Sequence, residues 1–244
     1  MNRPRRRHTN RRHGGPIILA PDHPAIREDR PLFPGMVRSA TTVNRVLKSG
    51  SGSRKLGSHW SRSTEWRGIP IYSLTLPERS TCPASCPVRP CCYGNGMQLA
   101  PRFIPDANLL ARLTIEIENL ASVFPEGFSI RLHALGDFVS REYTQFWIDA
   151  VHQIPSVHCF GFTAHERRSE IGSLIEEESM KWDRFRIRFS GGEGKRSARV
   201  MDAPSWGSHS DGITCPADAD HTDNSCGSCG LCLSVKNRIV FKAH

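Results

Sequence analysis

The spacing of three short apolar segments constrains the fold of this chain more than any other feature. Segments 128–135, 157–164 and 184–190 begin 29 and 27 residues apart, with stretches of helical periodicity between them. This period is typical of β-α-β units, in which the strands run parallel and the connections are right-handed. An earlier strand is expected over 68–76. The sequence therefore predicts an α/β fold built on parallel strands.

The helices expected between these strands carry recognisable start signals. Asp106, Ser140 and Ser169 each stand just before an apolar stripe with helical spacing, where a short polar side chain can cap the first turn. Pro125 and Pro155 follow the first two stripes and stop them. We expect helices that begin near 107, 141 and 170.

Charged residues alternate with apolar ones in two of the expected strands. Arg131 and His133 alternate with apolar residues in 128–135, and Arg184, Arg186 and Arg188 do so in 184–190. Parallel strands covered on both faces would be nearly all apolar. A full or partial βα barrel with a wet, cationic lumen fits this pattern better than a flat doubly wound sheet. An exposed edge strand over 184–190 is the alternative.

A cysteine-rich loop follows the first expected strand. Residues 81–94 read TCPASCPVRPCCYG and contain Cys82, Cys86, Cys91 and Cys92. Pro83 and Pro87, which each follow a cysteine, make this stretch a rigid loop rather than a helix or a central strand. Clustered thiols in an intracellular chain favour a metal or iron–sulfur site over a disulfide or inert buried thiols. Either Cys91 or Cys92 can serve as the third ligand.

Other polar residues are expected at the same end of the sheet. Gly136 and Asp137 follow the strand over 128–135, His165 follows the next strand, and a Gly-rich loop over 191–194 follows the fourth. Active sites of βα barrels lie on the loops after the carboxyl ends of the strands. Asp137, His133 and His165 are therefore the candidate catalytic residues.

A second group of cysteines lies near the C-terminus. Cys215, Cys226, Cys229 and Cys232 have the spacing C-x10-C-x2-C-x2-C. Steps of three residues resemble the cysteine run of bacterial ferredoxins more than the paired knuckles of zinc ribbons. We expect an iron–sulfur cluster here, with zinc as the alternative and disulfides less favoured than either. Cys159 falls within a strand and is expected to be a buried apolar residue.

Basic residues are concentrated at the N-terminus. Residues 1–67 hold 15 Lys and Arg against 4 Asp and Glu, whereas the remaining residues hold 18 against 20. We expect a basic, largely disordered arm over 1–67, a βα partial barrel over 68–210 and a four-cysteine segment over 211–244. The arm could bind nucleic acid non-specifically. No run is long enough to span a membrane, so a cytoplasmic protein is expected.

Several of these stretches together resemble the phage gene-product-88 family of uncharacterised bacteriophage proteins. The matching stretches are 81–93, 131–147 (RLHALGDFVSREYTQFW), 160–165 (FGFTAH), 225–232 (SCGSCGLC) and the ending RIVFKAH. The resemblance covers most of 70–244 and leaves out the basic arm. In that family the third loop cysteine precedes a tyrosine, which implies Cys92. It also implies a phage-encoded protein of the host cytoplasm.

The layout is also similar to that of radical S-adenosylmethionine enzymes. Those enzymes carry three cysteines after the first barrel strand and an acidic Gly-rich motif after the second, although the spacing C-x3-C-x5-C departs from their usual C-x3-C-x2-C. The resemblance implies an open 4Fe-4S cluster on Cys82, Cys86 and Cys92, with redox or radical chemistry on an unknown, anionic substrate.

This resemblance also implies roles for the polar residues. Asp137, with Gly136, would bind the amino group of S-adenosylmethionine, and Cys215, Cys226, Cys229 and Cys232 would hold an auxiliary cluster. Arg131, His133, Arg186 and Arg188 would line the lumen and bind the substrate or the cofactor carboxylate. The competing hypothesis is a non-enzymatic, zinc-stabilised phage protein that binds nucleic acid through its arginine-rich arm.

Overall fold

A mostly parallel sheet of eight strands forms the centre of the computed structural model, which describes residues 17–62, 65–201, 212–217 and 224–242. The strand order is β2-β3-β5-β6-β7-β8-β10-β9, and only the β2–β3 pair is antiparallel. The strands are β2 (Lys48–Ser49), β3 (Ile71–Thr75), β5 (Phe128–Leu135), β6 (Val157–Thr163), β7 (Phe185–Ser190), β8 (Ser197–Met201), β9 (Gly212–Thr214) and β10 (Arg238–Lys242). The predicted α/β class and the parallel β5, β6 and β7 are confirmed.

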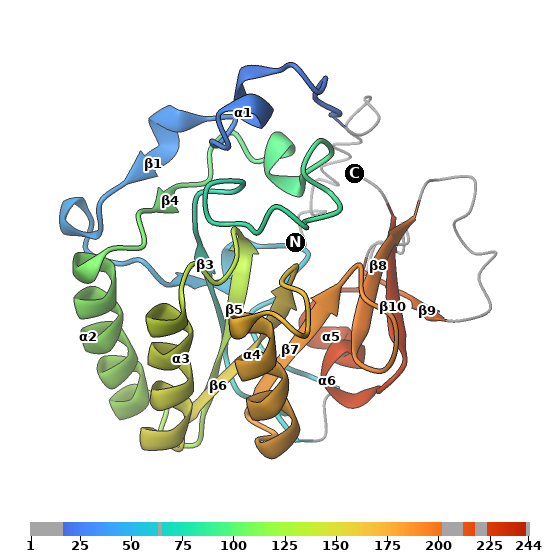
Figure 1. Cartoon of the computed structure of the whole chain (residues 1–244). Coiled ribbons are helices and arrows are strands. Elements are labelled where there is room, and N and C mark those ends of the chain that lie inside the picture. The colour runs from blue at the N-terminus through green and yellow to red at the C-terminus, as the bar shows by residue number, and fades with distance from the viewer. Residues whose placement is uncertain (1–16, 63–64, 202–211, 218–223, 243–244) are drawn as a thin grey trace, which may run out of the picture.

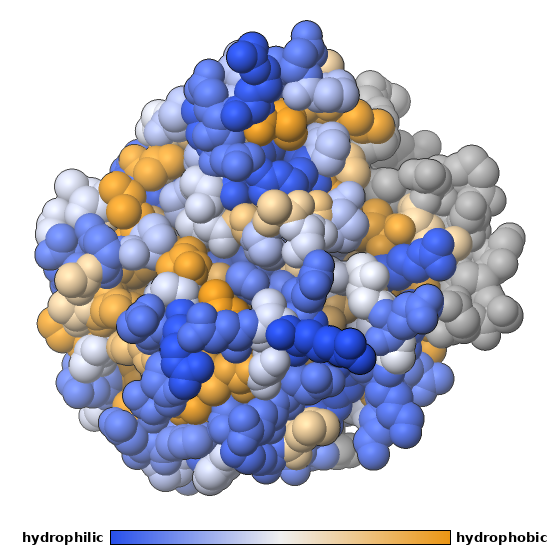
Figure 2. Space-filling view, viewed as in Figure 1, coloured by the Kyte–Doolittle hydropathy of each residue, from blue (hydrophilic) through white to orange (hydrophobic). Residues whose placement is uncertain are grey.

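Three long helices cover one face of this sheet (Figure 1). They are α2 (Ala107–Val123), α3 (Arg141–Gln153) and α4 (Glu170–Lys181). Asp106, Ser140 and Ser169 cap them as expected, each accepting a hydrogen bond from a backbone N–H three residues on. The apolar sides of the helices pack with β3, β5, β6 and β7 in the main core. Their outward surfaces are mostly hydrophilic, with small apolar areas (Figure 2).

The other face of the sheet is covered by different parts of the chain. Residues 53–62 and 65–69 pack there together with two short helices, α5 (Cys226–Cys229) and α6 (Leu231–Ser234). Trp60 and Trp66 form a second apolar cluster with Phe160 and Leu233, and the Trp60 indole donates to Ser129 Oγ at 2.8 Å. The expected barrel is not seen: among the described strands no pair joins β2 to β9, so the sheet stays open.

The polar strand β7 lies inside the sheet. It pairs with β6 on one side and with β8 on the other. The alternative of an exposed edge strand over 184–190 is therefore wrong. Its arginines alternate because one face of β7 packs on the helices while the other meets the C-terminal segment.

The expected disordered arm does not extend to residue 67. Residues 17–62 and 65–67 include α1 (Pro24–Arg27), the edge strand β2, short 3-10 turns and β1 (Val37–Arg38). β1 forms a small parallel pair with β4 (Arg102–Phe103). Val46 and Leu47 are buried, and their N–H groups donate to the Glu116 carboxylate of α2 at 2.7 and 2.9 Å. Residues 1–16, which carry most of the arginine run, lie outside the described residues.

The C-terminal segment belongs to the same sheet as the rest of the chain. β10 lies between β8 and β9 and is parallel to both. The four-cysteine segment predicted over 211–244 is thus built into the central sheet through two of its strands. Within the described ranges, no helix is long and apolar enough to cross a membrane.

Candidate functional site

The cysteine loop lies beyond the carboxyl end of β3, on the rim where the parallel strands end, beside the N-terminal segment (Figure 1). A buried ion network holds its base. Glu78 accepts from Arg102 Nε at 2.6 Å and from Arg102 Nη2 at 3.1 Å, and both side chains are fully buried. Arg79 donates to the Arg89 carbonyl and to the Asn95 amide oxygen. The loop is therefore fixed by charged hydrogen bonds inside the protein.

Three thiols of this loop are close enough to influence one another and are withdrawn from solvent. Burial raises the pKa of Cys82, and the charges of Asp137, Cys86 and Cys92 raise it further. Burial also raises the pKa of Cys86, and that of Cys92 to about 11. All three are neutral thiols at physiological pH without a metal, and a metal would have to displace their protons.

The adjacent residues Cys91 and Cys92 have different surroundings. Cys92 is the N-cap of a short 3-10 helix, Tyr93–Gly96, and its Sγ accepts a hydrogen bond from Gly94 N at 3.4 Å. Cys91 lines the larger cavity described below. The two neighbouring thiols therefore lie in different surroundings.

The chemistry of the thiol set suits a negatively charged cluster. Arg79 Nη1 is buried and has no hydrogen-bond partner among the described residues; the nearest carboxylate oxygen, Glu78 Oε1, is 3.8 Å away. The charge of Arg79 lowers the pKa of Cys92, so this guanidinium lies within electrostatic reach of the loop thiols. In the described part of the chain, no three His, Cys, Asp or Glu side chains are arranged around one metal ion. A cluster spreads its thiolates over several irons, so it requires wider spacing than a single ion does.

Asp137 serves a different purpose from the one predicted. It is buried, and its carboxylate accepts from Phe138 N at 2.8 Å, from Thr163 Oγ1 at 2.8 Å and from Ala164 N at 2.6 Å. Burial raises its pKa, while the Ala164 N–H opposes the rise. It joins the ends of β5 and β6 and lines neither cavity described below.

Gly136 is explained by the turn that it makes. Its φ is +81°, and a Cβ there would lie 2.6 Å from both Leu76 Cβ and Thr81 Oγ1. Glycine is needed for this close approach and this backbone conformation. The side chains nearest to Gly136 are those of Leu76 and Thr81, and neither of them lines a cavity described below.

His133 points away from the polar face, contrary to the prediction. Between the pairs Ser73–Arg131 and Thr75–Leu135, β5 has two more residues than β3. The alternation of β5 is broken in this irregular stretch, because Arg131 and Ala134 line the cavity whereas His133 does not. His133 Nε2 lies 2.8 Å from the Tyr143 hydroxyl of α3. Burial lowers the pKa of His133 to about 3. The side chain is a neutral core histidine.

His165 stays near the rim. Its Nε2 lies 2.7 Å from the Phe138 carbonyl oxygen. His165 also lines a cavity of about 210 Å³, together with Ser85 and Pro87 of the cysteine loop. Since Ser85 and Pro87 flank Cys86, His165 and the loop thiols are brought to one region of the structure, as the sequence predicts.

Arg186 and Arg188 are committed to protein contacts. Arg186 donates to Asp183, to Glu65 and to the Leu233 carbonyl. Arg188 is buried and donates to the carbonyls of Cys232, Val235 and Asn237. The prediction that both line an open lumen is wrong, because they are satisfied by the chain around the C-terminal cysteines.

The C-terminal cysteines gather against the polar face of the sheet. Cys226 and Cys229 begin and end α5, Cys232 lies in α6, and Cys215 donates its N–H to Val240 of β10. Burial raises the pKa of Cys232 to about 12, and the charges of Cys226 and Cys215 add to the rise. Cys215, Cys226 and Cys232 are therefore close enough to influence one another, and Cys229 lies within reach of Cys226. Among the described residues no three of these thiols are arranged around a single metal ion, so the four-cysteine site stays a prediction.

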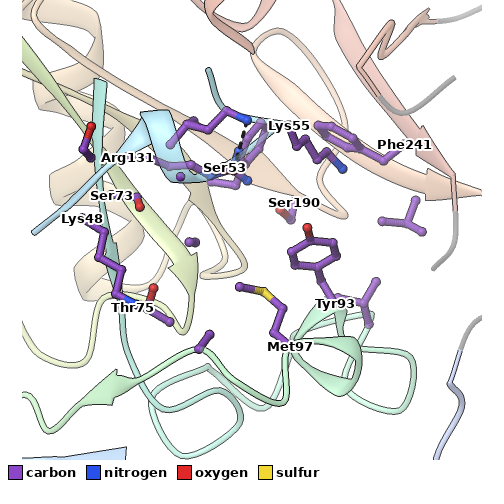
Figure 3. Close-up of a pocket in the computed structure, with 18 of the residues that line it drawn as sticks. Lys48, Ser53, Lys55, Ser73, Thr75, Tyr93, Met97, Arg131, Ser190 and Phe241 are labelled. Carbon is purple, nitrogen blue, oxygen red and sulfur yellow. Dashed lines mark hydrogen bonds between the residues drawn. The ribbon is translucent and has the colours of Figure 1, made fainter. Parts of the chain in front are cut away.

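A large cavity opens between the two cysteine groups. It has a volume of about 570 Å³ and extends from Cys91 of the loop to Arg131 of β5. Arg131 Nη1 lies 3.9 Å from Cys226 Sγ, so the same side chain reaches the C-terminal group. Lys48 and Lys55 also line the cavity, as Figure 3 shows.

These two lysines were missed by sequence reasoning. Both fall in the stretch assigned to a disordered arm. The antiparallel pairing Lys48–Ser73, which brings β2 to the edge of the sheet, joins residues far apart in the chain. No local pattern in a two-residue strand signals such a contact.

Comparison with known proteins adds no relative to this description. No family model, curated protein or solved structure matches the chain.

Proposed function

We propose that this protein is an iron–sulfur protein that carries out redox chemistry on an organic molecule bound beside its cysteine loop. Cys82, Cys86 and Cys92 would hold one cluster, with one iron left open to a ligand. Cys215, Cys226, Cys229 and Cys232 would hold a second cluster with a closed set of thiolates. Such clusters supply one-electron transfer when they are bound.

One observation carries this proposal. The loop thiols are buried within electrostatic reach of Arg79, whose Nη1 has no hydrogen-bond partner among the described residues. An unpaired donor on a buried cation is costly. A negatively charged cluster beside it would provide the missing acceptor, whereas three neutral thiols do not.

The surrounding residues hold the thiols in position. The Glu78–Arg102 pair fixes the base of the loop, and Thr81 Oγ1 accepts from Asp137 N at 3.3 Å. Asp137 in turn joins the ends of β5 and β6. Ser85 Oγ donates to the Ala164 carbonyl at 3.0 Å, which ties the middle of the loop to β6. The loop is therefore preorganised by contacts with three strand ends.

The C-terminal group has a matching feature. Arg131 Nε is buried and has no hydrogen-bond partner in the part of the chain that the structure describes, and Arg131 Nη1 faces Cys226 Sγ. The charges of Arg188 and Arg131 both lower the pKa of Cys232. A cationic surrounding of this kind stabilises thiolates that ligate a metal.

S-adenosylmethionine does not fit the residues predicted to bind it. Asp137 already accepts three hydrogen bonds and lines neither cavity. Arg186 and Arg188 are satisfied by protein carbonyls and carboxylates. We therefore derive no step through S-adenosylmethionine, and the proposal is limited to cluster-based redox chemistry.

Metal analysis after anaerobic purification tests the proposal. We expect iron and acid-labile sulfide in stoichiometric amounts, with the broad visible absorption of iron–sulfur clusters. Cys92→Ser should remove the iron of the loop site. Cys91→Ser is the matched control, because Cys91 is the adjacent thiol and faces the cavity. A colourless protein with stoichiometric zinc would overturn the proposal, and equal iron loss in both variants would overturn the ligand assignment.

A further inference from the structure

The cavity between the two cysteine groups has the size of a small-molecule site. Its volume of about 570 Å³ falls within the range of roughly 300–1,000 Å³ that ligand pockets occupy. Its walls come from β2, β3, β5, β6, β7, β8 and β10 and from the cysteine loop. Residues that are distant in the sequence therefore converge on one hollow at the polar face of the sheet.

The charges around the cavity are all of one sign. Lys48, Lys55 and Arg131 line it, and no Asp or Glu belongs to the lining that the described residues provide. In Figure 3, Lys48 lies on one side of the cavity, and Lys55 lies on another. Charges of one sign around a hollow with protein walls attract a ligand of the opposite charge.

Aromatic rings form part of the walls. Lys55 Nζ lies 5.3 Å from the ring centroid of Tyr93 and 6.0 Å from that of Phe241. The Arg131 guanidinium lies 5.6 Å from the ring centroid of Phe162, and Phe162 and Phe241 meet edge to face at 5.3 Å. The cations and the flat apolar surfaces are thus interleaved, an arrangement that suits a planar ring attached to an anionic group.

Hydroxyl groups complete the polar part of the lining. Ser49 and Ser53 come from the segment that carries the two lysines, and Ser73 and Thr75 come from β3. Hydroxyls can donate hydrogen bonds to phosphate or carboxylate oxygens as well as accept from ring nitrogens.

We propose that this cavity binds a nucleotide-sized organic anion, with its phosphate between Lys48, Lys55 and Arg131 and its planar ring against Tyr93 and Phe241. The ligand class is a phosphorylated molecule with an aromatic ring system. S-adenosylmethionine is disfavoured here because its sulfonium and amino groups outweigh its carboxylate and leave it with a net positive charge. The inference concerns binding alone and stands whether or not the cysteines hold clusters.

Equilibrium binding of a fluorescent ADP derivative to the full chain tests this inference. We expect saturable binding that weakens as salt is added, because partly exposed charges are screened. Unlabelled ADP should displace the probe. Adenosine, which has the ring without the phosphates, and S-adenosylmethionine should compete at least tenfold less well. Lack of saturable binding, or competition by S-adenosylmethionine equal to that by ADP, would overturn the inference.

Lysine variants locate the site. Lys48→Gln and Lys55→Gln should each raise the dissociation constant about fivefold, since each removes one partly exposed charge. Lys181→Gln is the matched control, because Lys181 lies on α4 on the other side of the sheet and pairs with Glu177. Unchanged affinity in both cavity variants, or an equal loss in the control, would show that the nucleotide binds elsewhere.

Iron content measured on the same samples separates this inference from the proposed function. Neither lysine is a candidate ligand, so both variants should keep the iron of the parent protein. Nucleotide binding by a protein without iron would uphold the cavity assignment and remove the redox proposal. Iron-loaded protein that fails to bind the nucleotide would uphold the redox proposal and overturn the cavity assignment.

Discussion

The two cysteine groups of this protein are built in different ways. The loop thiols Cys82, Cys86 and Cys92 come from one stretch of chain at the rim of the sheet, and other residues of that stretch line both cavities. The C-terminal thiols come from the end of β9 and from α5 and α6, and they pack against the polar face of the sheet. Under the proposed function, the first group would contact a substrate and the second would have a structural or relay role.

The charges that hold the two groups also differ. The loop rests on the Glu78–Arg102 ion pair, in which both partners are buried. The C-terminal segment is held by Arg188, whose guanidinium donates to three backbone carbonyls. One group therefore depends on a pair of opposite charges, and the other depends on a single charge bonded to backbone dipoles. Variants in both groups probe this contrast, in order of decreasing effect.

Cys229→Ala should have the largest effect. A closed set of thiolates contributes folding free energy directly, so its loss is expected to cost more than roughly 5 kcal/mol and to lower the melting temperature sharply. Cys92→Ala should lose loop iron with a smaller change in melting. Thermal unfolding under anaerobic conditions, with metal analysis, measures both. Wild-type melting and full metal content in Cys229→Ala would refute the four-cysteine assignment.

Glu78→Gln should destabilise the loop by about 3–5 kcal/mol, because it leaves the buried charge of Arg102 uncompensated. Glu65→Gln provides the control. Glu65 also pairs with an arginine, Arg186, but the Glu65 side chain is 57% exposed, so its loss should cost less than about 1 kcal/mol. Urea unfolding compares the two variants, and equal costs would argue against a buried ion pair at the loop base.

Arg188→Met should cost about 2–4 kcal/mol, because the carbonyls of Cys232, Val235 and Asn237 lose their shared donor. Hydrogen exchange should increase over 226–242 and stay unchanged in the cysteine loop. Arg199→Met, at an exposed position of β8, is the control. Faster exchange in the loop instead would mean that the two groups are not held independently.

His133 provides a reference point that belongs to neither group. Its pKa is about 3 in the folded protein, below the ordinary value of 6.5. The stability from keeping it neutral is present above pH 6.5 and is lost as the pH falls toward 3, by roughly 2 kcal/mol at pH 5. His133→Gln should flatten this part of the stability–pH curve measured by urea unfolding. An unchanged curve would place the acid sensitivity in other residues.

Local signals in the sequence predicted the helical layer well. Asp106, Ser140 and Ser169 cap the three helices, and the strand starts near 128, 157 and 184 match β5, β6 and β7. Such features depend on residues within one turn or one strand, so they can be predicted without knowledge of the fold.

Features that depend on distant contacts were not predictable in the same way. His133 faces α3 because β5 bulges against β3, and the bulge leaves no signature in the alternation of residues. Arg188 alternates with apolar residues along β7, as expected of a residue that faces a lumen. Its guanidinium instead donates to backbone carbonyls 44–49 residues further along the chain. Trp60 and Trp66 lie in a stretch rich in Ser, Gly and Arg, but they form an apolar cluster against the sheet.

The position of β10 has a consequence for how the protein forms during synthesis. β10 follows β9 in the chain but inserts between β8 and β9. While the ribosome has not yet released residues 238–242, the outer edge of β8 has no partner strand, and β9 has nothing to pair with. An unpaired strand edge can recruit the same edge of another nascent chain. Polypeptides cut short before residue 238 should therefore associate with one another, because the pairing of β10 with β8 and β9 covers the edges on which they would do so.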